Sequence, residues 1–383
     1  VVAMDNATGD ILAYVGGIGG ESTAPAVDGA SAYRQAGSTL KPFLYALAIE
    51  KGYLTPASIL DDSPVELDTA SGLYVPQNYD RAFKGPVSAR MALAGSLNVP
   101  AVRTLLLTGV ERFRDRLWDT GYRGLVEDGD YYGYSLALGS AEVTLVEQVA
   151  AYRSLAMGGR WSPARLTLDA PHDAPRATTT PQAAWIVADM LADPNARAGT
   201  FGVDSALRLP FWAAVKTGTS KAMRDNWCIG FSDRFTVGFW IGNLEGDPLR
   251  AVSGTSGAAP VWRDMMLALH AARPSRPLPM PDGIERRTIR FAGAIEQPRQ
   301  EFFLRGTALD LVAAAPAAAR RPRITSPVAG SVYAVDPDIP PERQRLAVAV
   351  SGDARGHRLQ LDGRELGSPD THPLIVPSRG AHR

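Results

Sequence analysis

Gly37-Ser38-Thr39-Leu40-Lys41-Pro42-Phe43 places a serine and a lysine three residues apart at the start of an apolar, helix-patterned run. Residues i and i+3 share one face of a helix, so the Lys41 amine can reach the Ser38 hydroxyl. Pro42 is tolerated near a helix start, which places Ser38 in the first turn, where free N–H groups favour a developing negative charge. A serine hydroxyl becomes a nucleophile when a base takes its proton, and a neutral lysine is such a base. The stretch therefore predicts a serine–lysine catalytic pair.

Lysine is scarce in this chain, which gives the pair more weight. The 383 residues contain 35 arginines and five lysines, namely Lys41, Lys51, Lys84, Lys216 and Lys221. Arginine does not lose its proton, so it cannot act as the base. A serine three residues before a lysine is expected by chance in a chain of this length, so the prediction also depends on partner motifs later in the chain.

Two further motifs come later in the chain, in order, and each occurs once: Ser96-x-Asn98 and Lys216-Thr217-Gly218. Ser96 offers a hydroxyl that can relay a proton from Lys41 to a leaving amine. Asn98 offers an amide to hold Lys41 and the backbone of a substrate. Lys216 is a second cation, which would lower the pKa of Lys41 and attract a substrate carboxylate.

The residues after Lys216 complete the predicted site. Thr217 and Thr219 offer hydroxyl groups to the same carboxylate, and Gly218 lets an extended substrate lie against a strand edge. The backbone N–H groups of Ser38 and Thr219 are the expected oxyanion hole. Together, the three motifs predict acyl transfer through an acyl-enzyme on Ser38.

Composition excludes several other classes of protein. The formal net charge is zero, so nothing indicates a nucleic-acid partner. No apolar run approaches 18 residues, and no stretch of the given sequence has the pattern of a signal peptide. The single Cys228 excludes an internal disulfide and a cysteine zinc site. Because the sequence begins at Val1 within an expected strand and without a starting Met, we expect a fragment of a longer protein.

Strand patterns at both ends enclose a helix-rich middle, which predicts an α/β sandwich. The expected strands are residues 1–4, 11–15, 211–215, 226–231 and 235–242. The expected helices are residues 38–52, 87–97, 99–108, 111–117, 144–157, 181–191 and 258–271. We therefore expect a catalytic domain over residues 1–272. Residues 273–322, rich in Pro, Arg and Ala, are expected to be a linker, and residues 323–383 a truncated, small β-rich domain.

Other candidate sites have weaker support. Asp61-Asp62 suggests a metal site, but no third ligand has a fitting spacing, so a solvated turn is the better interpretation. The five histidines are scattered, without metalloprotease spacing. Gly254-Thr255-Ser256-Gly257-Ala258 narrowly misses the nucleophile-elbow pattern, and small-residue packing before the last helix is expected there.

The motifs and the runs around them resemble a known family. These runs are Ala36-Gly37-Ser38-Thr39-Leu40-Lys41-Pro42-Phe43, Asn78-Tyr79-Asp80, Ser96-Leu97-Asn98-Val99-Pro100-Ala101-Val102, Ala137-Leu138-Gly139-Ser140 and Asp225-Asn226-Trp227. They are similar to the transpeptidase domain of class A penicillin-binding proteins. The tail around Ile324-Thr325-Ser326-Pro327 resembles an extra C-terminal domain found in one group of that family.

The resemblance implies a fold and an activity. The fold is the serine β-lactamase/transpeptidase-like sandwich, with a mainly antiparallel sheet flanked by helices and a helical subdomain. The activity is D,D-transpeptidation, which cross-links the D-Ala-D-Ala stem peptides of peptidoglycan without metal or cofactor and is inhibited by β-lactam antibiotics. It implies action on the periplasmic side of the bacterial inner membrane, an N-terminal anchor and glycosyltransferase domain outside this sequence, and other cell-wall synthesis proteins as partners.

Three rival functions fit the same motifs. A D,D-carboxypeptidase would pass the acyl group to water, and a non-catalytic penicillin-sensing domain would keep Ser38 and Lys41 without turnover. A β-lactamase would hydrolyse its acyl-enzyme, but Leu97 stands where class A β-lactamases usually have aspartate, and no deacylating glutamate is evident in the sequence. The fate of the acyl-enzyme separates these functions.

Overall fold

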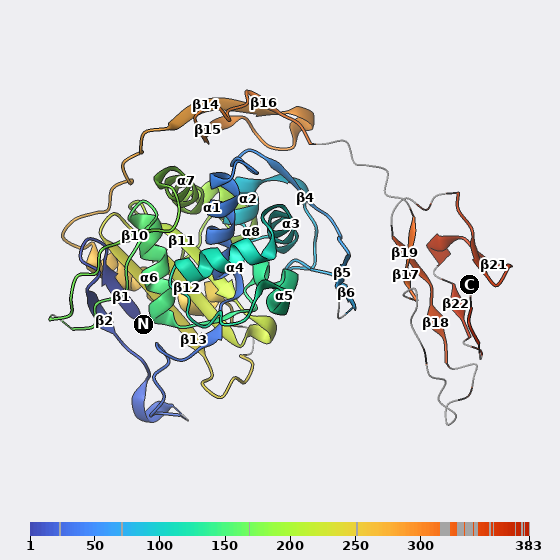
Figure 1. Ribbon diagram of the computed structural model, residues 1–383, viewed down its shortest axis with the longest axis horizontal. Helices are drawn as coiled ribbons and strands as arrows, with labels where there is room; N and C mark the ends of the chain where they lie inside the picture. Colours follow the sequence, from blue (N-terminus) through green and yellow to red (C-terminus); the bar gives the residue numbers. More distant parts are fainter. Residues whose placement is uncertain are drawn as a thin grey trace. The chain divides into compact units, whose positions relative to one another are not determined.

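The structure is a computed structural model of the chain. It describes residues 1–22, 24–69, 72–167, 169–249, 252–314, 322–327, 333, 340, 344–351, 354, 356–371, 373–376, 378 and 380–382. The chain divides into two compact units, Val1–Ala313 and Ala314–Arg383 (Figure 1). Each unit is described by itself.

A five-stranded antiparallel sheet forms the centre of the first unit. Its strand order is β11-β12-β13-β1-β2, so the first strands of the chain pair beside strands more than 200 residues later. The strands are β1 (Val2–Asp5), β2 (Ile11–Tyr14), β11 (Ala214–Thr219), β12 (Asp225–Phe231) and β13 (Phe235–Gly242). This arrangement confirms the predicted sandwich and its mainly antiparallel sheet.

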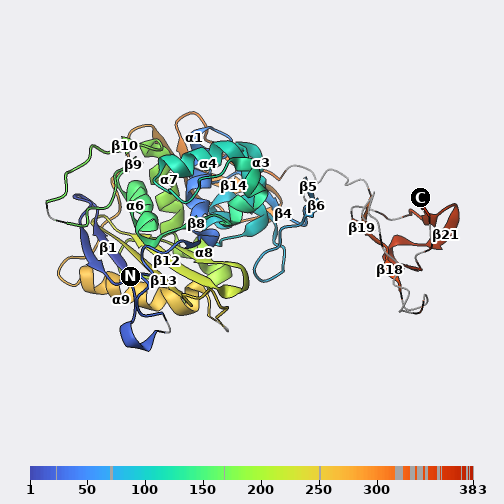
Figure 2. The same ribbon diagram turned by 60° about the horizontal axis from the view of Figure 1, so that its bottom comes forward.

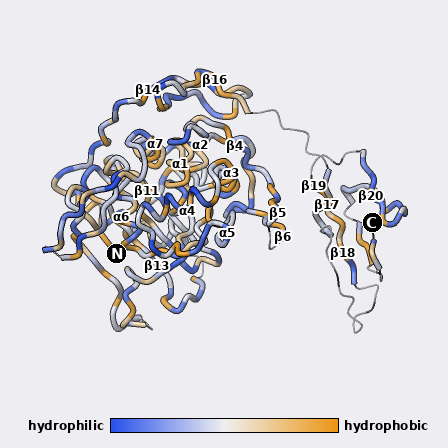
Figure 3. The backbone as a smooth tube through the Cα atoms, in the orientation of Figure 1, coloured by the Kyte–Doolittle hydropathy of each residue, from blue (hydrophilic) through white to orange (hydrophobic). Residues whose placement is uncertain are grey.

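Helices cover both faces of this sheet. One face packs against α6 (Leu145–Ala156) and the helices behind it, in a core that includes Leu40, Val149 and Trp227. The other face packs against α9, with Val215 and Trp262 in a second core. Figure 2 shows α6 and α9 on opposite sides of the sheet, and Figure 3 shows hydrophobic segments running through the interior of this unit. Strands β1 and β12 are buried nearly along their whole length, whereas Leu12 and Tyr14 of the edge strand β2 are exposed.

The helical part agrees with the predicted helices and adds two more. The helices are α1 (Lys41–Glu50), α2 (Ala89–Ala94), α3 (Asn98–Thr108), α4 (Val110–Asp119), α5 (Gly129–Tyr132), α6 (Leu145–Ala156), α7 (Pro181–Ala192), α8 (Pro194–Phe201) and α9 (Ala259–Leu269). The additions are α5 and α8, and α8 carries a clear start signal, since the Asp193 side chain accepts hydrogen bonds from Asn195 N and Ala196 N. Residues 85–88 form a strand before the shorter α2.

Short paired strands connect these elements. They are β3 (Arg34–Gln35) with β8 (Glu142–Val143), β4 (Ile59–Asp62) with β7 (Gly85–Ser88), β5 (Leu67–Thr69) with β6 (Gly72–Tyr74), and β9 (Arg160–Trp161) with β10 (Arg176–Ala177). No helix within the described ranges of the chain is long and apolar enough to cross a membrane.

Residues 273–313 belong to the first compact unit, whereas the sequence predicted a linker over residues 273–322. β14 (Ile284–Phe291), β15 (Arg299–Leu304) and β16 (Leu311–Val312) form a three-stranded sheet. Ile289 and Phe303 are fully buried in a cluster with Ala57. The ring of Trp185, on α7, lies edge-on to that of Phe302 at 4.9 Å between centroids. The Pro- and Arg-rich composition concealed this sheet because the three arginines of β14 are exposed, while its apolar residues Ile284, Ile289 and Phe291 are buried.

The described part of the second unit is built of short strand pairs. They are β17 (Arg323–Ser326) with β19 (Ala349–Ser351), β18 (Leu346–Ala347) with β22 (Leu374–Ile375), and β20 (Leu359–Leu361) with β21 (Arg364–Gly367). The side chains of Val348 and Leu359 are buried. The strands agree with the β-rich pattern that the sequence predicts there.

Candidate active site

Ser38 lies in a turn that leads directly into α1. Gly37–Leu40 form one turn of 3-10 helix, and α1 begins at Lys41. Two residues of α6 hold this turn: the Tyr152 hydroxyl donates to Thr39 O at 2.7 Å, and Gln148 Nε2 donates to Thr39 Oγ1 at 2.5 Å. Ser38 thus lies just before the α-helix, at the end where free N–H groups favour negative charge.

Glycine lets the Ser38 turn approach strand β11 closely. Gly37 has φ +55°, and a Cβ atom there would lie 2.9 Å from Thr219 O and 3.0 Å from Thr219 N. A Cβ on Gly218 would meet Thr39 Cγ2 at 2.7 Å. Any larger side chain at either position would push the turn off the strand. The two backbones expected to form the oxyanion hole, at Ser38 and Thr219, are therefore neighbours.

Lys41 is fully buried and reaches the second motif. Its Nζ donates to Ser96 O at 2.8 Å, to Leu97 O at 3.1 Å and to Asn98 Oδ1 at 2.7 Å. These three hydrogen bonds use all three protons of an ammonium group. A neutral amine has two N–H bonds and a lone pair, so Lys41 must release one acceptor before it can take the proton of Ser38.

The surroundings of Lys41 favour its neutral form. Burial lowers the pKa of the Lys41 amine well below the ordinary lysine value, and the charge of Lys216 lowers it further. The carboxylate of Asp62 acts in the opposite direction and raises that pKa. The balance leaves a larger fraction of Lys41 in the neutral form, which can accept a proton, than in a solvent-exposed lysine.

Lys216 contacts the side chain of Ser96 from the opposite direction. Its Nζ donates to Ser96 Oγ at 2.7 Å and to Thr217 O at 2.8 Å. Burial lowers the pKa of Lys216 to about 7. Ser96 therefore bridges the two lysines: its carbonyl oxygen accepts a hydrogen bond from Lys41, and its hydroxyl oxygen accepts one from Lys216.

Asp62 and Asn78 support the second motif, and sequence reasoning missed Asp62. Asp62 is fully buried, which corrects the expectation of a solvated turn at Asp61-Asp62. Asn78 Nδ2 donates to both oxygens of Asp62 at 2.9 and 2.8 Å. Asn78 Oδ1 in turn accepts from Asn98 N at 2.8 Å, at the first residue of α3. The charge pattern of Asp61-Asp62 gave no sign of this contact, because the Asn78 partner lies 16 residues later in the chain.

Thr219 also contacts the segment before α9. Gly254 N donates to Thr219 Oγ1 at 3.1 Å, which leaves the Thr219 hydroxyl proton for a ligand. A Cβ on Gly254 would lie 2.5 Å from Trp227 O, so this segment packs tightly on β12. The expected small-residue packing there is confirmed.

These residues surround one cavity of about 550 Å³. The predicted residues on its wall are Ser38, Ser96, Asn98, Thr217 and Thr219. Lys41, Lys216 and Gly218 lie directly behind that wall. The three motifs, far apart in the sequence, thus meet in space. Among the residues that the structure describes, no group of His, Cys, Asp or Glu forms a metal site.

Comparison with known proteins assigns the chain to a family. The family model described as "Penicillin binding protein transpeptidase domain" matches residues 1–242. The chain belongs to this family. The model described as "Penicillin-Binding Protein C-terminus Family" matches residues 312–383. The resemblance inferred from the motifs is therefore confirmed for both parts of the chain.

Two curated penicillin-binding proteins illustrate the relationship. Penicillin-binding protein 1C of Escherichia coli (strain K12) is 34% identical over 303 residues, which cover 78% of this chain and 38% of that protein. Penicillin-binding protein 2D of Bacillus subtilis (strain 168) is 30% identical over 300 residues, covering 74% and 42%. This chain thus spans well under half the length of these relatives.

Solved structures of penicillin-binding proteins share the fold. Penicillin-binding protein 1A from Haemophilus influenzae superimposes with a TM-score of 0.68 at 25% identity, over 80% of this chain and 53% of that one. The PonA1 protein from Mycobacterium tuberculosis, solved in complex with penicillin V, gives a TM-score of 0.62 at 23% identity over 73% of this chain and 79% of that one. The predicted fold class is confirmed.

Proposed function

We propose that this chain is the acyl-transfer part of a serine D,D-transpeptidase that cross-links peptidoglycan stem peptides. The observation that carries the proposal is the convergence of Ser38, Ser96 and two buried lysines on one cavity. A nucleophile, a base with a lowered pKa, a second hydroxyl and a cation are what acyl transfer from a peptide requires.

In the first half-reaction, Ser38 Oγ attacks the carbonyl between the two D-Ala residues of a donor peptide. Lys41, in its neutral form, takes the Ser38 proton. The developing oxyanion accepts hydrogen bonds from the backbone N–H groups of Ser38 and Thr219. Ser96 relays the proton to the leaving D-Ala amine; its hydroxyl accepts a hydrogen bond from Lys216 Nζ at 2.7 Å, and its carbonyl accepts one from Lys41 Nζ at 2.8 Å. The ester on Ser38 and free D-Ala are the products.

In the second half-reaction, an acceptor amine attacks the ester. It loses a proton through the same relay run backwards, and Ser38 recovers its own. The donor's terminal carboxylate is held in the first step by Lys216 and by the hydroxyls of Thr217 and Thr219. A strained β-lactam presents a similar carbonyl and carboxylate, so we expect it to acylate Ser38 and block the site.

The lining of the cavity supports transfer rather than hydrolysis. None of the described residues on the cavity wall is an aspartate or glutamate, so no carboxylate is in place there to activate a water. An amine is also a better nucleophile than water when both are unassisted. These points favour the transpeptidase over the β-lactamase and the carboxypeptidase.

The proposed function also implies where in the cell the protein acts. Peptidoglycan lies outside the cytoplasmic membrane, so the domain acts on the periplasmic side, tethered by a part of the protein outside this sequence. Its partners are stem peptides, β-lactams and other cell-wall synthesis proteins. No step requires a metal or a cofactor.

The test supplies a D-Ala-D-Ala stem peptide together with a D-amino acid as acceptor. Mass spectrometry should detect the exchanged peptide, and Ser38→Ala should abolish both this product and covalent labelling by a penicillin. Hydrolysed peptide alone, at every acceptor concentration, would establish a carboxypeptidase. Labelling without turnover of either kind would establish a penicillin sensor.

A further inference from the structure

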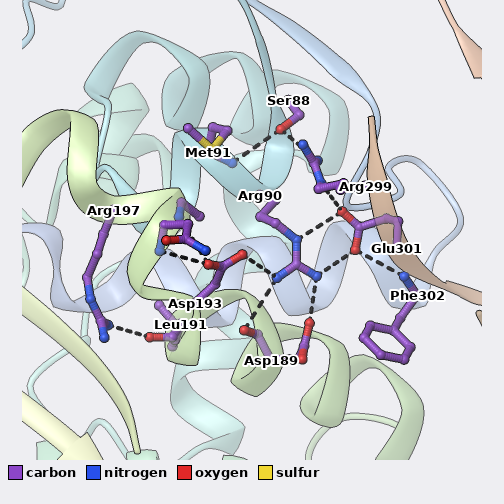
Figure 4. Close-up of polar contacts among 12 residues, drawn as sticks. Ser88, Arg90, Met91, Asp189, Leu191, Asp193, Arg197, Arg299, Glu301 and Phe302 are labelled. Carbon is purple, nitrogen blue, oxygen red and sulfur yellow. Dashed lines mark hydrogen bonds and ion pairs between the residues drawn. The ribbon is translucent and has the colours of Figure 1, made fainter. Parts of the chain in front are cut away.

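A cluster of buried charges lies outside the proposed active site, between α2 and the three-stranded sheet. Arg90, on α2, and Glu301, on β15, have side chains that are 5% and 0% exposed. Arg90 Nε donates to Glu301 Oε2 at 2.9 Å, and Arg90 Nη2 donates to Glu301 Oε1 at 2.5 Å (Figure 4). This two-pronged pairing fixes the direction as well as the distance between the two elements.

The surrounding groups keep the pair charged. Arg90 Nη2 also donates to Asp189 Oδ2 at 2.6 Å, and Arg299 Nε donates to Glu301 Oε2 at 3.0 Å. Burial alone would raise the pKa of Glu301, but the hydrogen bonds and charge of Arg90 outweigh it and hold the pKa below its ordinary value. A buried ion pair whose remaining donors and acceptors are satisfied is costly to break from one side.

Ser88, at the start of α2, is also hydrogen-bonded to residues of the segment that contains this sheet. The Ser88 hydroxyl accepts from Met91 N at 3.3 Å and so caps the helix. Ser88 N donates to Glu296 Oε1 at 2.7 Å, and Arg299 Nη2 donates to Ser88 Oγ at 3.1 Å. We call the contacts of Ser88 and Arg90 with residues 296–301 the α2 clamp.

The α2 clamp is close to Ser96 along the chain. α2 has only six residues and runs through Gly95 into Ser96, so Arg90 and Ser96 are about 9 Å apart along a helical rise. Ser96 has φ +60°, a left-handed conformation that costs a non-glycine residue energy. A strained residue that bridges two lysines depends on its surroundings to stay in place.

We propose that the α2 clamp positions Ser96 between Lys41 and Lys216, which makes the three-stranded sheet a working part of the transpeptidase site. The inference rests on the proposed function for the role of Ser96 in proton relay. Arg90 and Glu301 touch no substrate and act only through Ser96. A displacement of α2 by about 1 Å would break hydrogen bonds of 2.7 and 2.8 Å at Ser96.

A mutant cycle on the full chain tests the coupling. Glu301→Gln keeps the shape but removes the charge, and we expect it to slow acylation of Ser38 by a fluorescent penicillin on the order of tenfold or more. In a Ser96→Ala background the same substitution should have a clearly smaller effect, since the hydroxyl that the clamp positions against Lys216 is absent and only the carbonyl contact with Lys41 remains. An equal loss in both backgrounds, or no loss in either, would overturn the proposal.

Glu285→Gln is the matched control. Glu285 lies on the same sheet, where it pairs with the exposed Arg287 and accepts a hydrogen bond from Gly306 N rather than from α2. Its substitution should leave the acylation rate unchanged. If Glu301→Gln lowers the folded fraction measured by circular dichroism, Arg90→Lys, which keeps the charge but loses the two-pronged pairing, replaces it in the cycle.

Hydrogen–deuterium exchange tests the clamp without any reaction. Glu301→Gln should speed exchange in a peptide covering residues 89–97 and leave residues 41–50 unchanged. Exchange that is unchanged at residues 89–97, or faster throughout the unit, would refute positioning. If the wild-type chain shows no acylation, the proposed function fails, and exchange still decides whether the clamp holds Ser96.

Discussion

Lys41 and Lys216 are both buried, and each hydrogen-bonds to a different atom of Ser96. Two buried cations so close together cannot both hold a proton without a large cost. We propose different roles for them, with Lys41 as the neutral base and Lys216 as the cation. Substitution by arginine, which keeps its proton, separates the roles.

Lys41→Arg should lower the acylation rate on the order of 100- to 10,000-fold, because it removes the base. Lys216→Arg should cost about tenfold or less, since a fixed cation remains. Stopped-flow acylation by a fluorescent penicillin measures both. Equal tolerance of the two substitutions would contradict the division of roles.

The pKa of Lys216 also predicts the pH dependence. Because its pKa is about 7, Lys216 loses its charge as the pH rises through that value. The acylation rate should therefore fall as the pH rises above about 7, when the carboxylate of the penicillin loses its partner. In Lys216→Arg this fall should disappear, because arginine keeps its charge. A fall of the same size in the variant would assign it to another group.

Asp62 should set the acidic limb of the same profile. Its carboxylate raises the pKa of Lys41, so Asp62→Asn should lower that pKa and move the rising limb of the acylation rate to lower pH. Asp61→Asn is the matched control, because this neighbour is exposed. A limb that stays in place in Asp62→Asn, or moves equally in both variants, would show that Asp62 does not act on Lys41.

Among the connecting elements, the loop before β8 is packed directly against the Ser38 turn. Gly139 has φ +77°, and a Cβ atom there would lie 1.8 Å from Gly37 O. Gly139→Ala should cost about 3 kcal/mol or more in free energy of unfolding, from backbone strain and overlap together. Gly52→Ala, with φ +70° and open space around it, should cost about 1 kcal/mol. Urea unfolding measures both, and equal costs would mean that the Gly37 contact is unimportant.

The strongest elements could be predicted because their signals are local. Ser38, Lys41 and Pro42 define a helix start by spacing alone, and the apolar strands β12 and β13 are long enough to be recognised from composition. In place of the strand expected over residues 211–215, β11 begins at Ala214 and includes Lys216, Thr217 and Gly218. The approach of Ser96 to Lys41 could be predicted from the chemistry of acyl transfer, but the contact of its hydroxyl with Lys216 is seen only in the structure.

The role of Asp62 and the three-stranded sheet could not be predicted, because both depend on contacts between residues far apart in the sequence. Asp62 is charged and lies beside another acid, so only its burial against Asn78 reveals it as part of the site. β14 carries three arginines and a few apolar residues that reach a core, and its partner Ala57 lies more than 200 residues earlier. A strand whose sequence is mostly polar can still be well packed when its few apolar side chains contact apolar residues far away in the sequence.

At the scale of the whole molecule, we propose that the acylating unit is Val1–Ala313 rather than residues 1–272. Residues after 272 supply Glu301 to a buried arginine and Phe302 to Trp185. Leu278 O also accepts a hydrogen bond from Trp185 Nε1 at 3.0 Å. These contacts make the stretch part of the core that supports α2 and α7.

Two truncated chains test this boundary. A chain ending at Ala313 should keep the acylation rate and melting temperature of the catalytic unit, because the compact unit ends there. A chain ending at Ala272 should melt at a lower temperature and acylate more slowly, because Arg90 is left buried without Glu301 and the apolar faces of Trp185 and Ala57 are uncovered. Differential scanning calorimetry and penicillin labelling at a single temperature compare the two. If the chain ending at Ala272 matched the longer one in both measurements, the sheet would be an appendage, and the boundary would return to the end of α9.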